Sequence, residues 1–129
     1  MLELRHIEDK EALRSFCLSF KQPFTNKLEA YAAFCGGGAV GVCFFTIEDE
    51  LLLRDAIIEE EYGAELCDGL VRAVLNYAEL HGVVRAKFAE GFNEKAKESL
   101  HRFGFKQNVI EDIDKFLTGC KSCSNNTLL

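Results

Sequence analysis

The residues with the clearest potential for chemistry lie where an apolar segment passes through a glycine into an amphipathic segment. The acidic run Glu59–Glu61 directly follows Ile57 and Ile58, and Gly63 precedes a segment with helical periodicity. A helix that starts directly after a buried strand points unpaired N–H groups and the positive end of its dipole at the turn. The junction therefore predicts an anion site beside carboxylates that could accept protons.

Two interpretations are open for Glu59, the first carboxylate of this run. Its place after a buried strand, at a predicted cleft, suits a general base that takes a proton from an amine, directly or through water. Alternatively, residues 59–61 form a solvated acidic turn without a catalytic part. The same acidity would attract a cationic amine acceptor.

Cysteines offer a second kind of chemistry. Cys67, on the predicted first helical turn, could have a lowered pKa and react, or it could pack beside Leu66 in the buried stripe. Cys120 and Cys123 have the spacing of a metal or redox pair, but they lack a second pair and a nearby histidine. No metal site is predicted, and the cysteines within apolar segments are expected to be free thiols.

Composition limits the class of protein. The chain has 129 residues, 48% hydrophobic and 28% charged, and its 15 basic and 21 acidic residues give a formal net charge of −6. This balance is typical of one soluble domain, and no basic cluster indicates nucleic acid as a partner. No apolar run is long enough to span a bilayer, and the N-terminus lacks the layout of a signal peptide. A cytoplasmic protein without a membrane partner is expected.

Hydrophobic periodicity predicts the elements that must position these residues. The expected order is strand, helix, three antiparallel strands, helix, strand, helix and a final pair of strands. Strand 51–58 and the strand that follows the long helix should lie parallel, joined by a right-handed crossover. The expected ranges are 2–7, 8–20, 31–34, 39–47, 51–58, 66–81, 83–88, 94–103 and, for the final pair, 105–117.

This order resembles the GNAT superfamily of acyl-CoA-dependent N-acyltransferases over about residues 1–117. Two patterns carry the resemblance. The segment 57–63 before a helix looks like the family's pyrophosphate-binding segment, and Asn93-x-x-Ala96 followed by 103–105 (Phe-Gly-Phe) is similar to its Asn-x-x-Ala…Gly-Phe segment. The resemblance implies an α/β (α+β) fold, with a mixed sheet of an antiparallel meander plus a parallel strand pair, and helices on both faces. Residues 1–119 would form this domain and 120–129 a polar tail.

The resemblance also implies acetyl-CoA as co-substrate, an amine acceptor and no metal. The phosphates would bind at the start of the long helix, and the pantetheine arm would enter where the two parallel strands part, expected at Ile58. Asn93 suits a contact with the coenzyme and equally a helix cap. The implied coenzyme-binding residues are Ile57, Ile58, Gly63, Ala64, Glu65, Leu66, Cys67 and Asn93.

The chain departs from the family's pattern in the loop and at the proton donor. Tyr62 stands where the family has Arg or Gln, and Glu65 and Cys67 stand where it has small residues. A carboxylate ~4 Å from a diphosphate would cost about 4 kcal/mol at an effective dielectric constant of 20, and about 1 kcal/mol if hydrated. Pointing outward, Glu65 would only favour the helix N-terminus. Leu100 replaces the tyrosine that often protonates the CoA thiolate, and His101 is turned about 100° away on the helix.

The sequence therefore predicts an acyl-CoA-dependent N-acetyltransferase that acts on a small amine or a peptide amine. The alternative is a degenerate GNAT-fold protein without efficient acetyl-CoA binding, serving as a binding or interaction module. A third class is a metal or redox protein that uses Cys120 and Cys123. Because GNAT-like proteins commonly pair through sheet edges or terminal strands, the resemblance also suggests a homodimer.

Overall fold

A six-stranded mixed sheet forms the centre of the computed structural model, which describes residues 2–119. The strands follow one another in chain order across the sheet, and all neighbours are antiparallel except β4 and β5, which are parallel. The predicted meander and parallel pair are confirmed. The strands are β1 Leu2–His6, β2 Glu29–Cys35, β3 Gly38–Ile47, β4 Leu51–Ile58, β5 Ala86–Phe88 and β6 Val109–Ile110. The predicted Cys120 and Cys123 tail lies outside the described residues.

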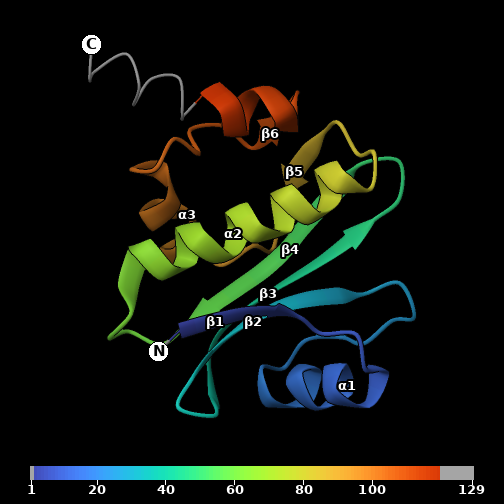
Figure 1. Ribbon diagram of the computed structural model, residues 1–129, viewed down its shortest axis with the longest axis vertical. Helices are drawn as coiled ribbons and strands as arrows, with labels where there is room; N and C mark the ends of the chain where they lie inside the picture. The colour runs from blue at the N-terminus through green and yellow to red at the C-terminus, as the bar shows by residue number, and fades with distance from the viewer. Residues whose placement is uncertain (1, 120–129) are drawn as a thin grey trace.

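Helices cover both faces of the sheet, as predicted (Figure 1). Helix α1 (Lys10–Ser19) packs on one face, while α2 (Gly63–Leu80) and α3 (Glu94–His101) lie on the other. The stripe of α2 forms because its apolar residues recur at helical spacing, so that one face is buried along the whole helix. Within the described part of the chain no helix is long and apolar enough to cross a membrane.

The end of the chain differs from the predicted pair of strands. Only the two residues of β6 are extended there, and residues 113–119 form a helix. Ile113, Phe116 and Leu117 are spaced i, i+3 and i+4, so they share one helix face that packs against the core. The side chain of Asp112 accepts a hydrogen bond from the Lys115 N–H at 3.1 Å and caps this helix.

The two parallel strands part earlier than the sequence predicts. Strand β5 pairs with β4 only from Leu51 to Leu53, so the expected separation at Ile58 is wrong. A bulge near Arg54 bends β4, and the chain after Phe88 turns away toward α3. The edge of β4 from 54 to 58 is therefore free of a neighbouring strand on the β5 side, while β3 still pairs with its other side.

Candidate active site

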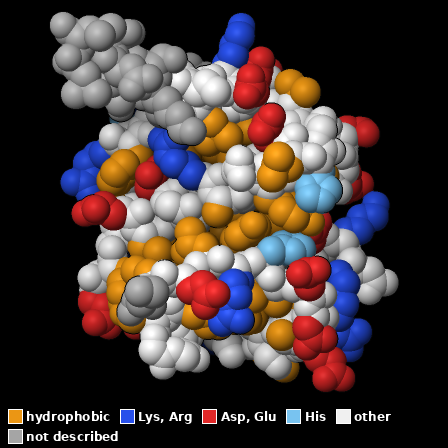
Figure 2. Space-filling model, in the orientation of Figure 1, with side chains coloured by type: hydrophobic (Ala, Val, Ile, Leu, Met, Phe, Trp, Pro, Cys, Tyr) orange, Lys and Arg blue, Asp and Glu red, His pale blue; other side chains and the backbone are white. Residues whose placement is uncertain are grey.

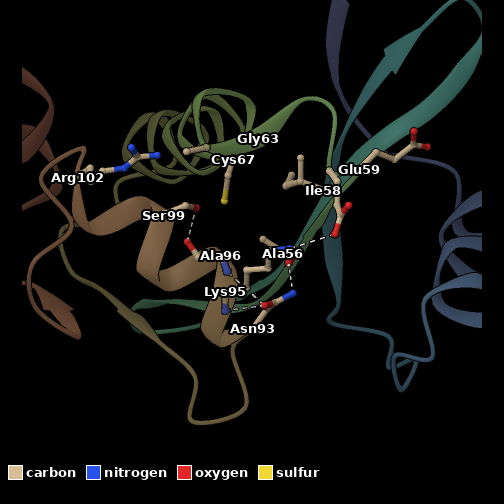
Figure 3. Close-up of a pocket in the computed structure, with 12 residues that line it drawn as sticks. Ala56, Ile58, Glu59, Gly63, Cys67, Asn93, Lys95, Ala96, Ser99 and Arg102 are labelled. Atoms are coloured by element: carbon tan, nitrogen blue, oxygen red, sulfur yellow. Dashed lines mark hydrogen bonds and ion pairs between the residues drawn. The ribbon is translucent and has the colours of Figure 1, made fainter.

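A cleft of about 480 Å³ opens between the free edge of β4, the start of α2 and one face of α3 (Figure 3). Six of the nine sequence-predicted site residues line it, and they come from two elements and the loops beside them. The lining residues are Ala56, Ile58, Glu59, Glu60, Gly63, Ala64, Cys67, Asn93, Lys95, Ala96, Ser99 and Arg102. Ile57, Glu65 and Leu66 do not line the cleft.

The backbone of β4 turns two residues toward the cleft. The N–H of Glu59 donates to the Val40 carbonyl of β3 at 2.9 Å. Because the residues of an antiparallel ladder alternate in direction, the backbone groups of Ala56 and Ile58 face the opposite edge, toward the cleft. Ala56 is already engaged, since its N–H donates to Asp55 Oδ1 at 2.9 Å and its carbonyl accepts from Asn93 Nδ2 at 3.2 Å. Ile58 therefore offers the backbone groups that an entering ligand can meet.

Asp55 braces the open edge of β4. Its Oδ1 accepts a hydrogen bond from the Asn93 backbone N–H at 2.9 Å, and its Oδ2 accepts one from Gln22 Nε2 at 2.7 Å. One half-buried carboxylate thus ties β4 to the loop before α3 and to the segment after α1. Sequence reasoning missed this residue. The available signal was an aspartate in a strand that is apolar except for the neighbouring Arg54, since a polar group in such a strand needs partners.

Asn93 acts as the cap of α3. Its Oδ1 accepts hydrogen bonds from the backbone N–H groups of Lys95 at 3.0 Å and Ala96 at 3.2 Å. The same side chain reaches across to β4 through its amide nitrogen. The cap is therefore present, and the residue also forms part of the cleft wall.

The start of α2 presents free backbone donors to the cleft. Gly63 has φ +63°, a conformation that favours glycine, and no side chain caps the helix. Ala64 in the first turn lines the cleft, whereas Glu65 is exposed outside it. The side chain of Tyr62 packs against the core beside the sheet. Neither Glu65 nor Tyr62 closes the cleft, so the N-terminal end of the α2 dipole stays accessible.

The thiol of Cys67 lies inside the cleft wall. Burial raises the pKa of this thiol to about 11, and a hydrogen bond with Ser99 offsets only part of that effect. The thiol is protonated at neutral pH, which contradicts the interpretation as a low-pKa nucleophile and favours packing. Within residues 2–119 the cysteines Cys17, Cys35, Cys43 and Cys67 are free. The same residues contain no group of three His, Cys, Asp or Glu side chains placed to hold a metal ion.

Helix α3 and its C-cap residue Arg102 supply polar and basic side chains that sequence reasoning missed. Lys95, Ser99 and Arg102 line the cleft, and Figure 3 shows Arg102 directed toward Gly63. Lys95 Nζ lies 3.3 Å from Glu60 Oε1, so this ion pair links α3 to the turn after β4. Positions 95, 99 and 102 are spaced i, i+4 and i+7, which was the signal that they share one face.

The acidic and proton-donor candidates occupy different places. Glu59 is exposed at the end of β4, and its side chain extends away from α2 and α3 (Figure 3). Leu100 is fully buried in the core. His101 is exposed and lies outside the cleft lining, as the helical spacing predicts. The hydroxyl of Ser99 faces the cleft and donates to the Ala96 carbonyl at 2.8 Å.

The fold is shared with solved N-acetyltransferases. One is the ribosomal-protein-S18-alanine N-acetyltransferase of Escherichia coli, at a TM-score of 0.60 and 13% identity, covering 81% of this chain and 77% of that one. Another is an aminoglycoside 6'-N-acetyltransferase of Acinetobacter baumannii, at 0.60 and 14%, covering 84% and 92%. A third is an aminoglycoside N-acetyltransferase in complex with CoA, at 0.60 and 14%, covering 82% and 92%.

These similarities define the class of fold. The chain has the fold of the GNAT N-acetyltransferases, as the order of its elements predicts. No protein-family model matches the sequence, and no curated protein sequence matches it. At identities of 13–14%, these similarities establish the architecture.

Proposed function

We propose that the protein is an N-acyltransferase that moves an acyl group, most simply acetyl, from acyl-CoA to a small amine or a peptide amine. The observation that carries this proposal is the open cleft between the free edge of β4 and the uncapped start of α2. Such a cleft combines a backbone edge with a helix N-terminus, and these two features suit the two chemically different parts of a phosphorylated carrier.

The coenzyme's diphosphate would bind at the start of α2. The N–H groups of Gly63 and Ala64 and the helix dipole favour an anion there, and the Arg102 guanidinium points to the same place (Figure 3). This cation lies at the C-cap of α3, so the Arg or Gln replaced by Tyr62 is not needed in the loop. The amides of the pantetheine arm would pair with the backbone of Ile58, the outward-facing residue that the protein leaves available.

The chemistry would be direct attack of the amine on the thioester carbonyl. The amine nitrogen forms a bond to the carbonyl carbon, the carbon–sulfur bond breaks, and the CoA sulfur leaves as a thiolate that takes up a proton. Glu59 would accept the proton from the amine, directly or through water. Because its side chain extends away from α2 and α3, the acceptor would approach from the other side of β4 (Figure 3). The exposed carboxylates at 59–61 would attract a cationic amine.

Calorimetric titration with acetyl-CoA tests the coenzyme site. We expect the wild-type protein to bind and Ala64→Asp to weaken binding about tenfold or more, because a like charge ~4 Å away costs about 1–4 kcal/mol. Asn76→Asp is the matched control, because it adds the same charge at an exposed position farther along the same helix. It should leave affinity unchanged. Equal weakening by both variants would contradict the placement of the diphosphate.

A second candidate is the degenerate GNAT-fold module that binds a partner without transferring acyl groups. Burial of Leu100 in the core favours it, because this position holds no hydroxyl for the leaving thiolate. A folded protein that shows no heat of acetyl-CoA binding would support the module and contradict the transferase. The four cysteines within residues 2–119 are all free, which suits work in a reducing compartment such as the cytoplasm, and we propose this location.

A further inference from the structure

An exposed arginine interrupts β4 near the middle of the sheet. In the register with β3, Phe45 lies opposite Leu53 and Phe44 lies opposite Asp55, so Arg54 is the extra residue of the bulge. Arg54 is also the one residue of β4 that is exposed, since the other seven are buried or half-buried. The bulge therefore presents a positive charge to solvent from within an apolar strand.

The neighbours of Arg54 show which side of the sheet carries this charge. The adjacent Asp55 accepts a hydrogen bond from Gln22, which follows α1, and Ile57 packs against the apolar cluster of α1. Alternate residues of a strand share one face, so Asp55, Ile57 and Glu59 follow one another on the α1 side. Because Arg54 shares with Asp55 the place opposite one β3 residue, its charge belongs to the same side.

The α2 side of the sheet has a different character. Leu53 and Ala56 of β4 belong to the core cluster on that side and are fully buried. Figure 2 shows the α2 side of the molecule, with a band of hydrophobic side chains between α2 and the sheet edge. The exposed charge of β4 thus lies on the side to which Glu59 extends, from which the acceptor is proposed to approach (Figure 3).

The cations beside β4 are neutralised by carboxylates, whereas Arg54 is not. Arg85 Nη1 lies 2.6 Å from Glu50 Oε2, and Arg85 Nε lies 3.0 Å from Glu111 Oε1. Lys87 Nζ lies 3.4 Å from Glu50 Oε1. Within residues 2–119, Arg54 has no ion pair and no side-chain hydrogen bond. Its guanidinium is therefore available to an anion from outside the protein.

We propose that the acceptor is a peptide amine with an acidic residue a few positions from the reacting amine, and that Arg54 binds this acidic side chain. The inference rests on the proposed acyl transfer and narrows its acceptor. The cationic amine lies near Glu59 at the end of β4, and the peptide carboxylate meets the Arg54 guanidinium, whose planar fork can bind it through two hydrogen bonds. Charges of opposite sign at two places on β4 orient the acceptor along the strand.

The separation of the two charged residues favours a peptide over a small zwitterion. From position 54 to 59, a strand with a bulge spans roughly 13–16 Å at about 3.3 Å per residue. One extended residue spans at most about 3.6 Å, so a free amino acid cannot reach both places. Because the arginine side chain is long, the matching acidic residue lies about three to five residues from the amine.

Steady-state acetylation of a peptide series tests the proposal. Each short peptide has one amine, at its N-terminus, and an amidated C-terminus. A single glutamate is moved along the series, and every glutamate peptide has a glutamine twin and an arginine twin. For the wild type, kcat/KM of the best glutamate peptide should exceed that of its glutamine twin about tenfold, mainly through KM, because a charge-assisted hydrogen bond is lost in the twin.

Substitutions of Arg54 should change this preference in a graded way. Arg54→Gln should abolish the difference between the twins, and Arg54→Lys should keep part of it, since the charge remains without the planar fork. Arg54→Glu should reverse the preference toward the arginine twin. Lys106→Glu is the matched control, because it makes the same charge change at an exposed residue outside the cleft lining and should keep the preference for glutamate.

Titration with acetyl-CoA separates the failure of this inference from the failure of the proposed function. The Arg54 variants should bind acetyl-CoA as the wild type does, because Arg54 does not line the cleft. Equal rates for the glutamate and glutamine twins, a preference that survives Arg54→Glu, or acetyl-CoA binding without turnover of any glutamate peptide would overturn the inference and leave the coenzyme site standing. A wild type that does not bind acetyl-CoA would contradict the proposed function and the inference with it.

Discussion

The protein has two free strand edges with the same hydrogen-bonding capacity but different surroundings. The edge of β4 beyond Leu53 lies inside a cleft between α2 and α3, and Asp55 and Asn93 already occupy part of it. The edge of β1 lies at the border of the sheet, where every residue of the strand except His6 is exposed, and His6 stacks on Tyr77 of α2. Flanking helices, rather than the strand itself, therefore decide whether an edge suits a narrow ligand arm or a whole second strand.

The largest expected effect concerns the chemistry that only the β4 edge is proposed to support. Glu59→Gln should lower kcat of amine acetylation by about 10²-fold or more, the usual contribution of a general base, while acetyl-CoA affinity stays the same. Glu61→Gln is the control, because Glu61 carries the same charge in the same turn but does not line the cleft. Thiol release during turnover measures the rate. Equal loss in both variants would reduce the acidic run to simple attraction of a cationic acceptor.

The hydrogen bonds of Asp55 distinguish the edge of β4 from the edge of β1. Asp55→Ala removes the acceptor for Asn93 N–H and Gln22 Nε2, and should lower the free energy of unfolding by about 1–3 kcal/mol. Acetyl-CoA binding should fall as well, because the edge is no longer held open. Asp55→Asn keeps Oδ1 for Asn93 and should recover part of both losses. Urea unfolding and calorimetry measure them.

An exposed carboxylate provides the control for that experiment. Asp49 lies in the turn between β3 and β4, and Asp49→Ala should change the unfolding free energy little. If Asp55→Ala unfolded like this control and still bound acetyl-CoA normally, then the β4 edge would need no brace. The contrast between the two edges would then come from the helices alone.

The sequence predicts those parts of the fold that depend on local periodicity. The stripe of Leu66, Leu70 and Val74 marks α2, and the cap at Asn93 marks the start of α3. The helix at 113–119 differs from the predicted strands, because short apolar segments do not separate the helical period from the strand period well. The sequence does not predict the separation of β4 and β5 after Leu53, because the bulge of β4 depends on its contacts with the neighbouring strands.

Sequence patterns predicted only those residues of the candidate site that lie close together along the chain. Gly63, Ala64 and Cys67 lie together in one turn, so one local pattern reaches them. Arg102 and Ser99 reach the cleft only through the docking of α3 on α2, which no local pattern specifies. The role of Asp55 likewise depends on contacts with residues 33 and 38 positions away along the chain.

The buried thiol in the cleft wall gives a smaller effect that depends on pH. Burial raises the pKa of Cys67 above its usual 9.0, to about 11, so the unfolded chain loses this proton first as pH rises. The stability from the neutral thiol is complete below about pH 9 and is lost between about pH 9 and 11. Cys67→Ala should therefore flatten the decline of stability in this range.

A substitution that leaves a cavity on the same helix, at a residue without an ionisable group, is the control for this pH effect. Val71 is fully buried one turn after Cys67 and carries no ionisable group. Val71→Ala should lower stability by the same amount at every pH, leaving the slope between pH 9 and 11 unchanged. Thermal unfolding at a series of pH values measures both variants. A slope that Cys67→Ala does not alter would mean that the thiol ionises without cost and that the cleft wall is wet.

The smallest expected effect tests whether Glu60 competes with acetyl-CoA for the Lys95 ammonium group. Lys95 and Glu60 are 80% and 89% exposed, so their ion pair should contribute roughly 0–1 kcal/mol to stability. Glu60→Gln releases Lys95 and should tighten acetyl-CoA binding about two- to threefold, whereas Lys95→Ala should weaken it by a similar factor.

Glu61→Gln, outside the cleft, controls for net charge. Both shifts should shrink in high salt, because exposed charges are screened. Shifts of one sign in both variants would mean that the pair holds the cleft in shape, and the β4 edge would then depend on its rim as well as on Asp55.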